Sequence, residues 1–296
     1  MTDQSSTRVV GEASIRAYEP ADYDALVGLI GQAFGGETPD SVRFAASAGN
    51  TRSFVALRDG HVVGVSMAIG FGATAWIGNV VVDTGSRRRG LGQALTEAAV
   101  AAARERADSV LLLALGDAQR IYARLGFEDE GLYGTWRATD ATAALVAADA
   151  GHHAGARVVA AADAPELFEQ AVALDTWATG EDRRGYLELF APSLRVVLGR
   201  GTDGADVVAG YRTRKPWGTG AVVARDAATA RALLCDLLRE APDARLEFPD
   251  ANEAGVRLAT ELGLERFKEN MRMRLGRPVA GFRPEGVFKA LSPAVG

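Results

Sequence analysis

The chain has 296 residues and a formal net charge of −5, with 48% hydrophobic and 24% charged residues. This size and balance favour a globular protein of two domains and argue against a nucleic-acid-binding surface. The single cysteine excludes an intrachain disulfide, and three histidines without a Cys/His cluster argue against a metal site. The N-terminus lacks an apolar signal segment, and no apolar run reaches about 20 residues, so we expect a cytoplasmic protein with no membrane span.

Strands and helices alternate along the first half of the chain. The predicted elements are a strand at 14–18, a helix from Asp22, a helical stretch at 40–48, a hairpin of 53–57 and 62–67, a strand at 76–82, a helix at 91–106, a strand at 109–115, a helix at 117–125 and a strand from 127 to 136. This mixture predicts an α/β (α+β layer) fold.

The same order of elements recurs after an Ala-rich segment. We predict a first domain at 1–140, a linker at 141–155 and a second domain at 156–296. The predicted elements of the second domain are a strand at 157–161, helices at 165–176 and 183–190, a hairpin of 194–199 and 207–213, a strand at 221–224, a helix at 227–238, a strand at 244–248, a helix at 253–262 and a strand at 264–275. The Leu125–Phe127 motif falls on Leu262–Leu264, 137 residues later, and Arg87 falls on Arg225, 138 residues later. These two offsets indicate a tandem duplication.

The loop between strand 76–82 and helix 91–106 has the chemistry of a polyphosphate site. The first turn of a helix carries unpaired N–H groups and a partial positive charge, so it attracts anions. Gly90 and Gly92 remove side chains where a phosphate must approach the backbone, and the arginines at 87–89 add positive charge. The loop lacks the Lys-Ser/Thr pair of a nucleotide P-loop, which disfavours ATP or GTP.

The run from Val80 to Leu95 resembles the acetyl-CoA motif of the GNAT superfamily, a strand followed by Q/R-x-x-G-x-G/A. The resemblance implies two tandem GNAT-like domains, each a mixed, mostly antiparallel twisted sheet flanked by helices. It also implies acetyl-CoA as the cofactor, with its pyrophosphate on the loop amides and its pantetheine arm along the preceding strand. The cofactor-binding residues implied are Val80, Val81, Val82, Arg87, Arg88, Arg89, Gly90, Leu91, Gly92 and Gln93.

A second motif, from Asp117 to Phe127, resembles the family's helix that ends in Y-x-x-x-G-F. The resemblance implies that Tyr122 lies near the sulfur of coenzyme A and protonates the departing thiolate. A tyrosine hydroxyl suits this role because it keeps its proton at neutral pH. The alternative is a tyrosine whose ring only fills the core.

The reaction also needs a group that stabilises the oxyanion and a base that deprotonates the amine. We expect the backbone amide of Val82 to stabilise the oxyanion. The segment 76–79 holds no carboxylate, although a Glu often stands there in the family, and Asp83 is too close to the phosphate end. The candidates for the base are Asp117, Glu37, the terminal carboxylate of Gly296, a water chain and a group from the second half.

The second half departs from both motifs. Ala228 stands where the first glycine is expected, and Ala259 stands where Tyr122 is expected, so we predict a degenerate domain without catalysis. The polar stretch between its first two helices corresponds to the family's loop over the acceptor. Trp177, Glu181 and Asp182, with Arg183, are predicted to contact the substrate, with helix capping and surface pairing as the alternative.

These observations predict an acetyl-CoA-dependent N-acetyltransferase that acts on a primary amine of a small molecule. The alternatives are a protein or peptide N-acetyltransferase and a non-catalytic acetyl-CoA-binding regulatory module. Transfer of a longer acyl group also stays open. We expect a monomer or homodimer whose partner is the small-molecule amine, with no nucleic acid and no membrane.

Overall fold

A computed structural model describes residues 7–34, 42, 49–149, 157–202, 204–215, 218–292 and 294. Its contacts divide the chain into two compact units. Unit 1 consists of Met1–Glu128 with Met273–Pro278, and unit 2 consists of Asp129–Arg272 with Val279–Ala294. Apart from Val42, the helical stretch predicted at 40–48 lies outside the described residues.

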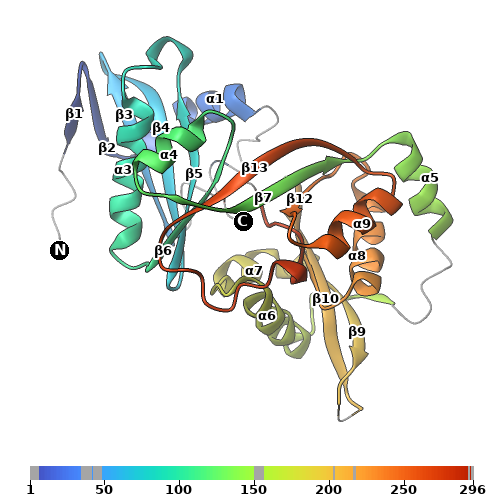
Figure 1. The fold of residues 1–296 in the computed structure, drawn as a ribbon. Helices are drawn as coiled ribbons and strands as arrows, with labels where there is room; N and C mark the ends of the chain where they lie inside the picture. The colour runs from blue at the N-terminus through green and yellow to red at the C-terminus, as the bar shows by residue number, and fades with distance from the viewer. Residues whose placement is uncertain are drawn as a thin grey trace. The chain divides into compact units, whose positions relative to one another are not determined.

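Unit 1 is a twisted, mostly antiparallel sheet with helices on both faces (Figure 1). Its strands, in sheet order, are β1 (Arg8–Val10), β2 (Ala13–Ala17), β3 (Thr51–Arg58), β4 (His61–Phe71), β5 (Thr74–Val82) and β6 (Ser109–Ala114). Its helices include α1 (Tyr23–Phe34), α3 (Leu91–Arg104) and α4 (Ala118–Arg124). The predicted hairpin is confirmed as β3 and β4, and its turn residues Asp59 and Gly60 both have positive φ, as a tight primed turn requires.

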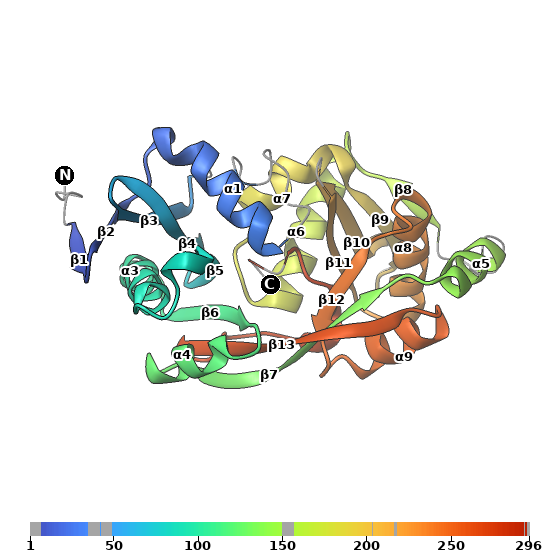
Figure 2. The same ribbon diagram turned by 90° about the horizontal axis from the view of Figure 1, so that it is seen from above.

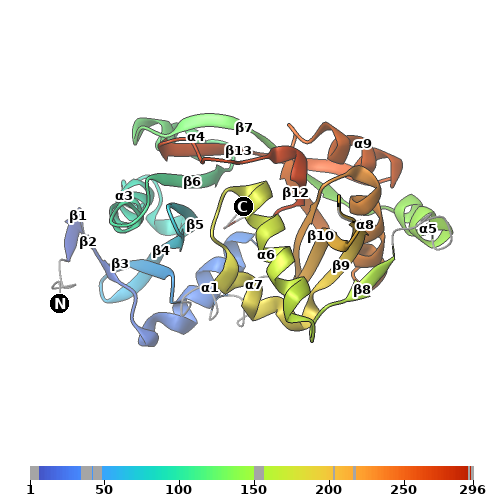
Figure 3. The same ribbon diagram turned by 90° about the horizontal axis from the view of Figure 1, so that it is seen from below.

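Helices α1 and α3 lie on opposite faces of β3–β5 (Figures 2 and 3). Helix α3 packs through Leu91, Ala94 and Leu95 in a buried apolar cluster that includes strand residues. Gly64 of β4 allows this approach, because an added Cβ would lie 2.8 Å from Leu95 Cδ1. The packing fixes where the N-terminus of α3 lies relative to the end of β5.

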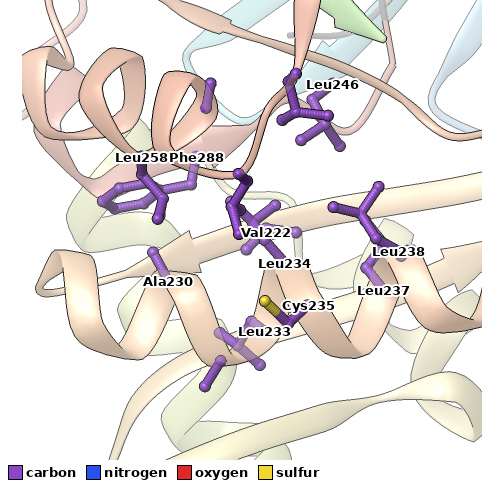
Figure 4. Packing of buried hydrophobic residues seen from close by; sticks show 14 of the residues in the cluster. Val222, Ala230, Leu233, Leu234, Cys235, Leu237, Leu238, Leu246, Leu258 and Phe288 are labelled. Carbon is purple, nitrogen blue, oxygen red and sulfur yellow. The ribbon is translucent and has the colours of Figure 1, made fainter. Parts of the chain in front are cut away.

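Unit 2 contains a sheet in the order β14-β11-β10-β9-β8 and a set of neighbouring strands β13, β7 and β12. The strands are β7 (Glu128–Arg137), β8 (Val158–Ala160), β9 (Arg195–Arg200), β10 (Asp206–Lys215), β11 (Gly218–Ala224), β12 (Arg245–Pro249), β13 (Glu265–Gly276) and β14 (Val287–Lys289). The helices are α5 (Asp140–Ala148), α6 (Pro165–Thr179), α7 (Arg184–Phe190), α8 (Ala227–Glu240) and α9 (Glu253–Glu261). The main core surrounds α8, where Leu233, Leu234 and the predicted core residue Cys235 are buried (Figure 4).

Strand β13 contributes residues to both units. The sequence predicts it as the returning strand of the second half, but from Met273 onward its residues belong to unit 1, next to β6. There Ser109 Oγ donates to Arg277 O at 2.6 Å, and Arg277 N donates to Asp108 O at 3.1 Å. The compact units therefore differ from contiguous segments at 1–140 and 156–296, because strand pairing at long range leaves no local pattern.

The segment predicted as a linker, 141–155, contains most of α5. Thr139 Oγ1 and Thr142 Oγ1 each donate to Gly263 O at 2.8 Å, and Val146 is buried in the core of unit 2. His152 and His153 lie outside the described residues.

The predicted fold class is confirmed, since the model has α/β units with sheets flanked by helices. None of the helices in the described ranges is long and apolar enough to cross a membrane. Within those ranges, no group of three His, Cys, Asp or Glu side chains is arranged to hold a metal ion.

Candidate active site

Strands β5 and β6 of unit 1 start as a parallel pair and then diverge. Their registered pairs, within these fully described strands, run from Thr74↔Ser109 to Trp76↔Leu111. Beyond Trp76, β5 pairs with β4. After Trp76, the edge of β5 that faces away from β4 therefore offers backbone groups that no described strand pairs with.

A bulge in β5 sets the direction of that edge. The register passes from Val65↔Val81 to Met67↔Gly78, so Asn79 and Val80 together oppose one residue of β4. Asn79 has φ 51°, a left-handed conformation that asparagine tolerates better than most residues. The sequence did not reveal this bulge.

The amide of Val82 faces the diverging side of β5. Asp83 N donates to Val63 O of β4 at 2.9 Å. Because hydrogen bonds alternate along an antiparallel ladder, the N–H and C=O of Val82 point away from β4. In agreement, Val82 O accepts a hydrogen bond from Arg87 Nε at 3.0 Å. The Val82 N–H thus points away from β4, and its role in binding a ligand stays a prediction.

The loop after β5 leads into a helix whose first amides are open. Gly90 is the N-cap of α3 with φ 79°, and it has no side chain to cap the helix. The first intrahelical bond is Ala94 N to Gly90 O at 3.0 Å, which leaves the N–H groups of Leu91, Gly92 and Gln93 without a helical acceptor. At Gly92 an added Cβ would meet only Val82 Cγ2, at 3.9 Å. This cradle of amides suits an anion.

The three predicted arginines directly precede Gly90 in the chain and are exposed. Arg87 bonds back to the end of β5, and Arg88 takes a left-handed φ of 59°. Arg89 lies 3.7 Å from Glu12 in a solvent-exposed pair, which is worth little energetically. The side-chain amide of Gln93 donates from Nε2 to Glu97 Oε1 at 2.9 Å on the outer face of α3. The backbone N–H of Gln93, and not its side chain, is therefore left for the loop site.

Tyr122 lies on α4, which ends as the sequence predicts. Gly126 N donates to Ala123 O, and Phe127 N donates to Tyr122 O at 3.1 Å, which is a Schellman end with φ 90° at Gly126. The Tyr122 ring is buried and meets Phe127 edge to face, with 6.0 Å between centroids. Burial raises the pKa of Tyr122 to about 12, so the hydroxyl keeps its proton at any physiological pH.

Among the three carboxylates predicted as bases, that of Asp117 lies within the described residues. Asp117 is exposed at the N-cap position of α4 and makes no side-chain capping bond. Glu37 and Gly296 lie outside the described residues. The identity of the base stays a prediction.

The corresponding turn of unit 2 is closed. Between β11 and α8 stand only Arg225 and Asp226, where unit 1 has Asp83–Gly90. The Asp226 carboxylate accepts hydrogen bonds from Thr229 N at 2.8 Å and from Thr229 Oγ1 at 2.9 Å. A carboxylate of the chain itself therefore binds the amide end that an anion would need.

This corrects the sequence match of Arg225 to Arg87 and of Ala228 to Gly90. Asp226, not Ala228, takes the N-cap position of Gly90. The match was wrong because six residues are missing from the second loop, which a fixed offset does not reveal. The other landmark is confirmed, since Leu264 N donates to Ala259 O at 2.9 Å and repeats the Schellman end of α4.

The residues predicted to contact the acceptor belong to the interior or rim of unit 2. The guanidinium groups of Arg225 and Arg283 lie over the Trp177 ring, 4.7 and 5.4 Å from its centroid. Arg183 is buried and donates to Asp175 at 2.9 Å from Nε, and Glu181 is buried 4.0 Å from it.

Asp182 is exposed and accepts a hydrogen bond from Arg184 N at 3.3 Å. The role of this stretch in acceptor binding stays a prediction.

Both halves match known acetyltransferase domains. Residues 49–129 and residues 171–287 each match a family model described as acetyltransferase (GNAT) domain. The chain therefore belongs to the GNAT acetyltransferase family and carries two of its domains in tandem.

Solved structures share this fold at low identity. A Pyrococcus horikoshii protein assigned as an acetyltransferase superposes with a TM-score of 0.81 and 19% identity over 100% of both chains. A GCN5-related N-acetyltransferase of Sphaerobacter thermophilus gives 0.62 and 15% over 92% of this chain and 98% of that one. A tandem GNAT protein from the clavulanic acid biosynthesis pathway gives 0.58 and 18% over 90% and 99%. No curated protein sequence matches the chain significantly.

Proposed function

We propose that unit 1 binds acetyl-CoA and transfers its acetyl group to a primary amine of a small molecule. The observation that carries the proposal is the open amide cradle of Leu91, Gly92 and Gln93 beside the unpaired edge of β5. A pyrophosphate fits the cradle because helix N-termini bind anions, and the exposed arginines add charge.

The residues divide the binding between two ends. The amides of α3 would hold the pyrophosphate, and the edge of β5 that faces away from β4 and ends at Val82 would pair with the amides of the pantetheine arm. When bound, acetyl-CoA supplies the acetyl group as an activated thioester. The Val82 N–H is then a donor for developing negative charge on oxygen, as preorganised backbone amides are in other acyl transfers.

Tyr122 provides the proton for the departing thiol. Its buried ring fixes the side chain, and among the described residues its hydroxyl has no hydrogen-bond partner that would hold the proton elsewhere. The raised pKa makes Tyr122 a weak acid whose hydroxyl stays protonated and neutral. Its contribution is therefore a well-positioned proton and not a strong driving force for proton transfer.

The first test replaces Tyr122 with phenylalanine. The ring and its edge contact with Phe127 remain, so we expect coenzyme affinity and thermal stability to stay close to those of the parent protein. The turnover number should fall by about 100-fold, the lower end of what a positioned acid contributes. Steady-state rates and coenzyme titration separate the two quantities, and an unchanged turnover number would remove Tyr122 from the chemistry.

The function itself is tested by thiol release from acetyl-CoA across a panel of small primary amines. Turnover on one or more amines supports the proposal. Turnover only on peptides with free N-termini would favour a protein N-acetyltransferase, and coenzyme binding without turnover on any acceptor would favour a regulatory module. Substituting propionyl-CoA or longer thioesters in the same assay decides the acyl length.

A further inference from the structure

In unit 2, a short strand lies at the position that corresponds to the gap between the diverging strands β5 and β6 of unit 1. In unit 1, strands β5 and β6 lie next to each other and diverge. In unit 2, the corresponding strands are β11 and β12, and among the described residues β11 pairs on that side with β14 instead. Strand β14 has the registered pairs Val222↔Lys289 and Val223↔Val287.

The segment of β14 also bonds to β12. Directly after β14, Ala290 N donates to Glu247 O of β12 at 2.6 Å. Asn252, which begins α9, donates from Nδ2 to Val287 O at 2.9 Å. The segment therefore lies between β11 and β12 and exchanges backbone hydrogen bonds with both sides.

The strand is held as tightly as a core element. Phe288 is 1% exposed and belongs to the same apolar cluster as Leu258 and Val222 (Figure 4). Just before β14, Gly286 approaches α6 so closely that an added Cβ would lie 2.7 Å from Trp177 Cζ3. Arg283 N donates to Ala178 O at 2.7 Å and anchors the segment to the same helix.

The space between β11 and β12, which we call the slot of unit 2, is filled by β14, and the N-terminus of α8 at its end is occupied as well. The Asp226 carboxylate caps α8 where unit 1 leaves the first amides of α3 open. A carboxylate at a helix N-terminus meets the same amides and the same partial charge that a phosphate would meet.

We propose that β14 and the Asp226 carboxylate occupy, within unit 2, the two places that a coenzyme A molecule takes in unit 1: the strand replaces the pantetheine arm and the carboxylate replaces the pyrophosphate. Unit 2 is thus a GNAT domain that carries its ligand in its own chain, and each chain binds one coenzyme. The comparison rests on the coenzyme site proposed for unit 1.

The test loosens β14 from two independent sides. Asn252→Asp keeps the oxygen that accepts from Gly255 N at 2.8 Å and so keeps the cap of α9, but it replaces the donor to Val287 O with an acceptor. Gly286→Ala pushes the segment away from Trp177 and Ala178, both on α6. Thr260→Val, which removes only an exposed bond to Val256 O, is the matched control.

Amide hydrogen exchange is the readout, measured with and without millimolar pantetheine. Arg225 N donates to Ala209 O of β10, so by the alternation along the ladder the N–H of Val222, which is registered with Lys289, faces β14. We expect exchange at 287–290 and at Val222 to become at least tenfold faster in both variants and to stay unchanged in the control. Added pantetheine should slow exchange at Val222 in the variants and not in the parent protein, because the space freed beside β11 accepts the arm. Titration of the parent protein should give one acetyl-CoA per chain.

Three results would overturn the proposal: two coenzymes per parent chain, parental exchange at Val222 in both variants, or variants with a loosened β14 in which pantetheine does not change exchange at Val222. If Asn252→Asp does not fold, Gly286→Ala alone still decides between these outcomes. A stoichiometry of zero would instead refute the coenzyme site of unit 1, while the exchange data would still report on the slot of unit 2.

Discussion

Replacing Gly92 with aspartate should weaken coenzyme A binding by about 100-fold or more, while Gly92→Ala should change it by less than about fivefold. Gly92 lies in the first turn of α3, and an added Cβ meets only Val82 Cγ2 at 3.9 Å, so both side chains fit. The aspartate places a negative charge beside the amides that would receive the pyrophosphate. Two like charges about 4 Å apart repel by about 4 kcal/mol at an effective dielectric constant near 20, which exceeds a hundredfold change in affinity.

Neither substitution should unfold the helix. Alanine favours a helix interior by up to about 1 kcal/mol over glycine, and a carboxylate in the first turn interacts well with the helix dipole. Isothermal titration with coenzyme A, together with thermal melting of both variants, measures the effect. Equal affinities for the aspartate and alanine variants would show that the pyrophosphate does not bind at this helix end.

Unit 2 already has an aspartate at the N-terminus of the helix that corresponds to α3. Asp226 caps α8, and the six residues that would have formed the loop are absent. The same backbone plan can therefore leave the first amides of the helix open or cap them, depending on whether the N-cap position holds glycine or aspartate. This explains why a family fold recurs in the chain while the chemistry of the site need not.

Elements with a strong local signal were predictable from the sequence. The amphipathic spacing of α3, the Asp59-Gly60 turn and the Gly126 helix end were each read from a few neighbouring residues, and each is present. The loop motif likewise identified where the open amides of α3 lie. These features are local, so the residues that determine them are adjacent in the sequence.

Features that depend on distant partners were not predictable. The strands β1 and β14 have three residues each, too few to show an alternating pattern. The passage of Met273 to Gly276 into unit 1 is decided by pairing with β6, more than 150 residues earlier. The bulge at Asn79 depends on register with β4, which a single strand does not encode.

The burial of the ionic groups of unit 2 was also not predictable from the sequence. Glu181 and Arg183 stand in a polar stretch that suggests a surface, yet both are buried near Asp175. Their pairing arises from tertiary packing, because buried charges persist only where partners meet them. Sequence alone shows the charges and not their partners.

Lys289 should make unit 2 less stable at neutral and acid pH than in alkali, and Lys289→Met should remove this dependence. The lysine lies in β14 with 5% of its surface exposed, and Nζ donates to Ala290 O at 3.0 Å. Burial is the largest cause that lowers the pKa of Lys289, to about 7, and the charge of Lys215 on β10 lowers it further. Glu247 on β12 opposes this shift.

The sign follows from the two pKa values of Lys289, about 7 when folded and 10.5 as the ordinary value. Below pH 7 the amine is charged in both states, so the folded protein bears the full penalty of a buried cation. Between about pH 7 and pH 10.5 the folded protein releases the proton while the unfolded chain keeps it, so the free energy of unfolding rises with pH. At about 1.4 kcal/mol per pKa unit, the gain is on the order of 5 kcal/mol.

Urea denaturation of the parent protein and of Lys289→Met from pH 6 to pH 10 measures this difference. The methionine variant should be the more stable by several kcal/mol at pH 6, with the gap shrinking as pH rises, because the apolar side chain fills the space without a charge. Without the lysine charge, the pKa of Glu247, already raised by burial, should rise further. Lys268→Met, at an exposed position, should leave the pH dependence unchanged. Parallel stability curves for the parent and Lys289→Met would mean that the β14 amine is solvated, and β14 would then be less firmly enclosed between β11 and β12 than its burial indicates.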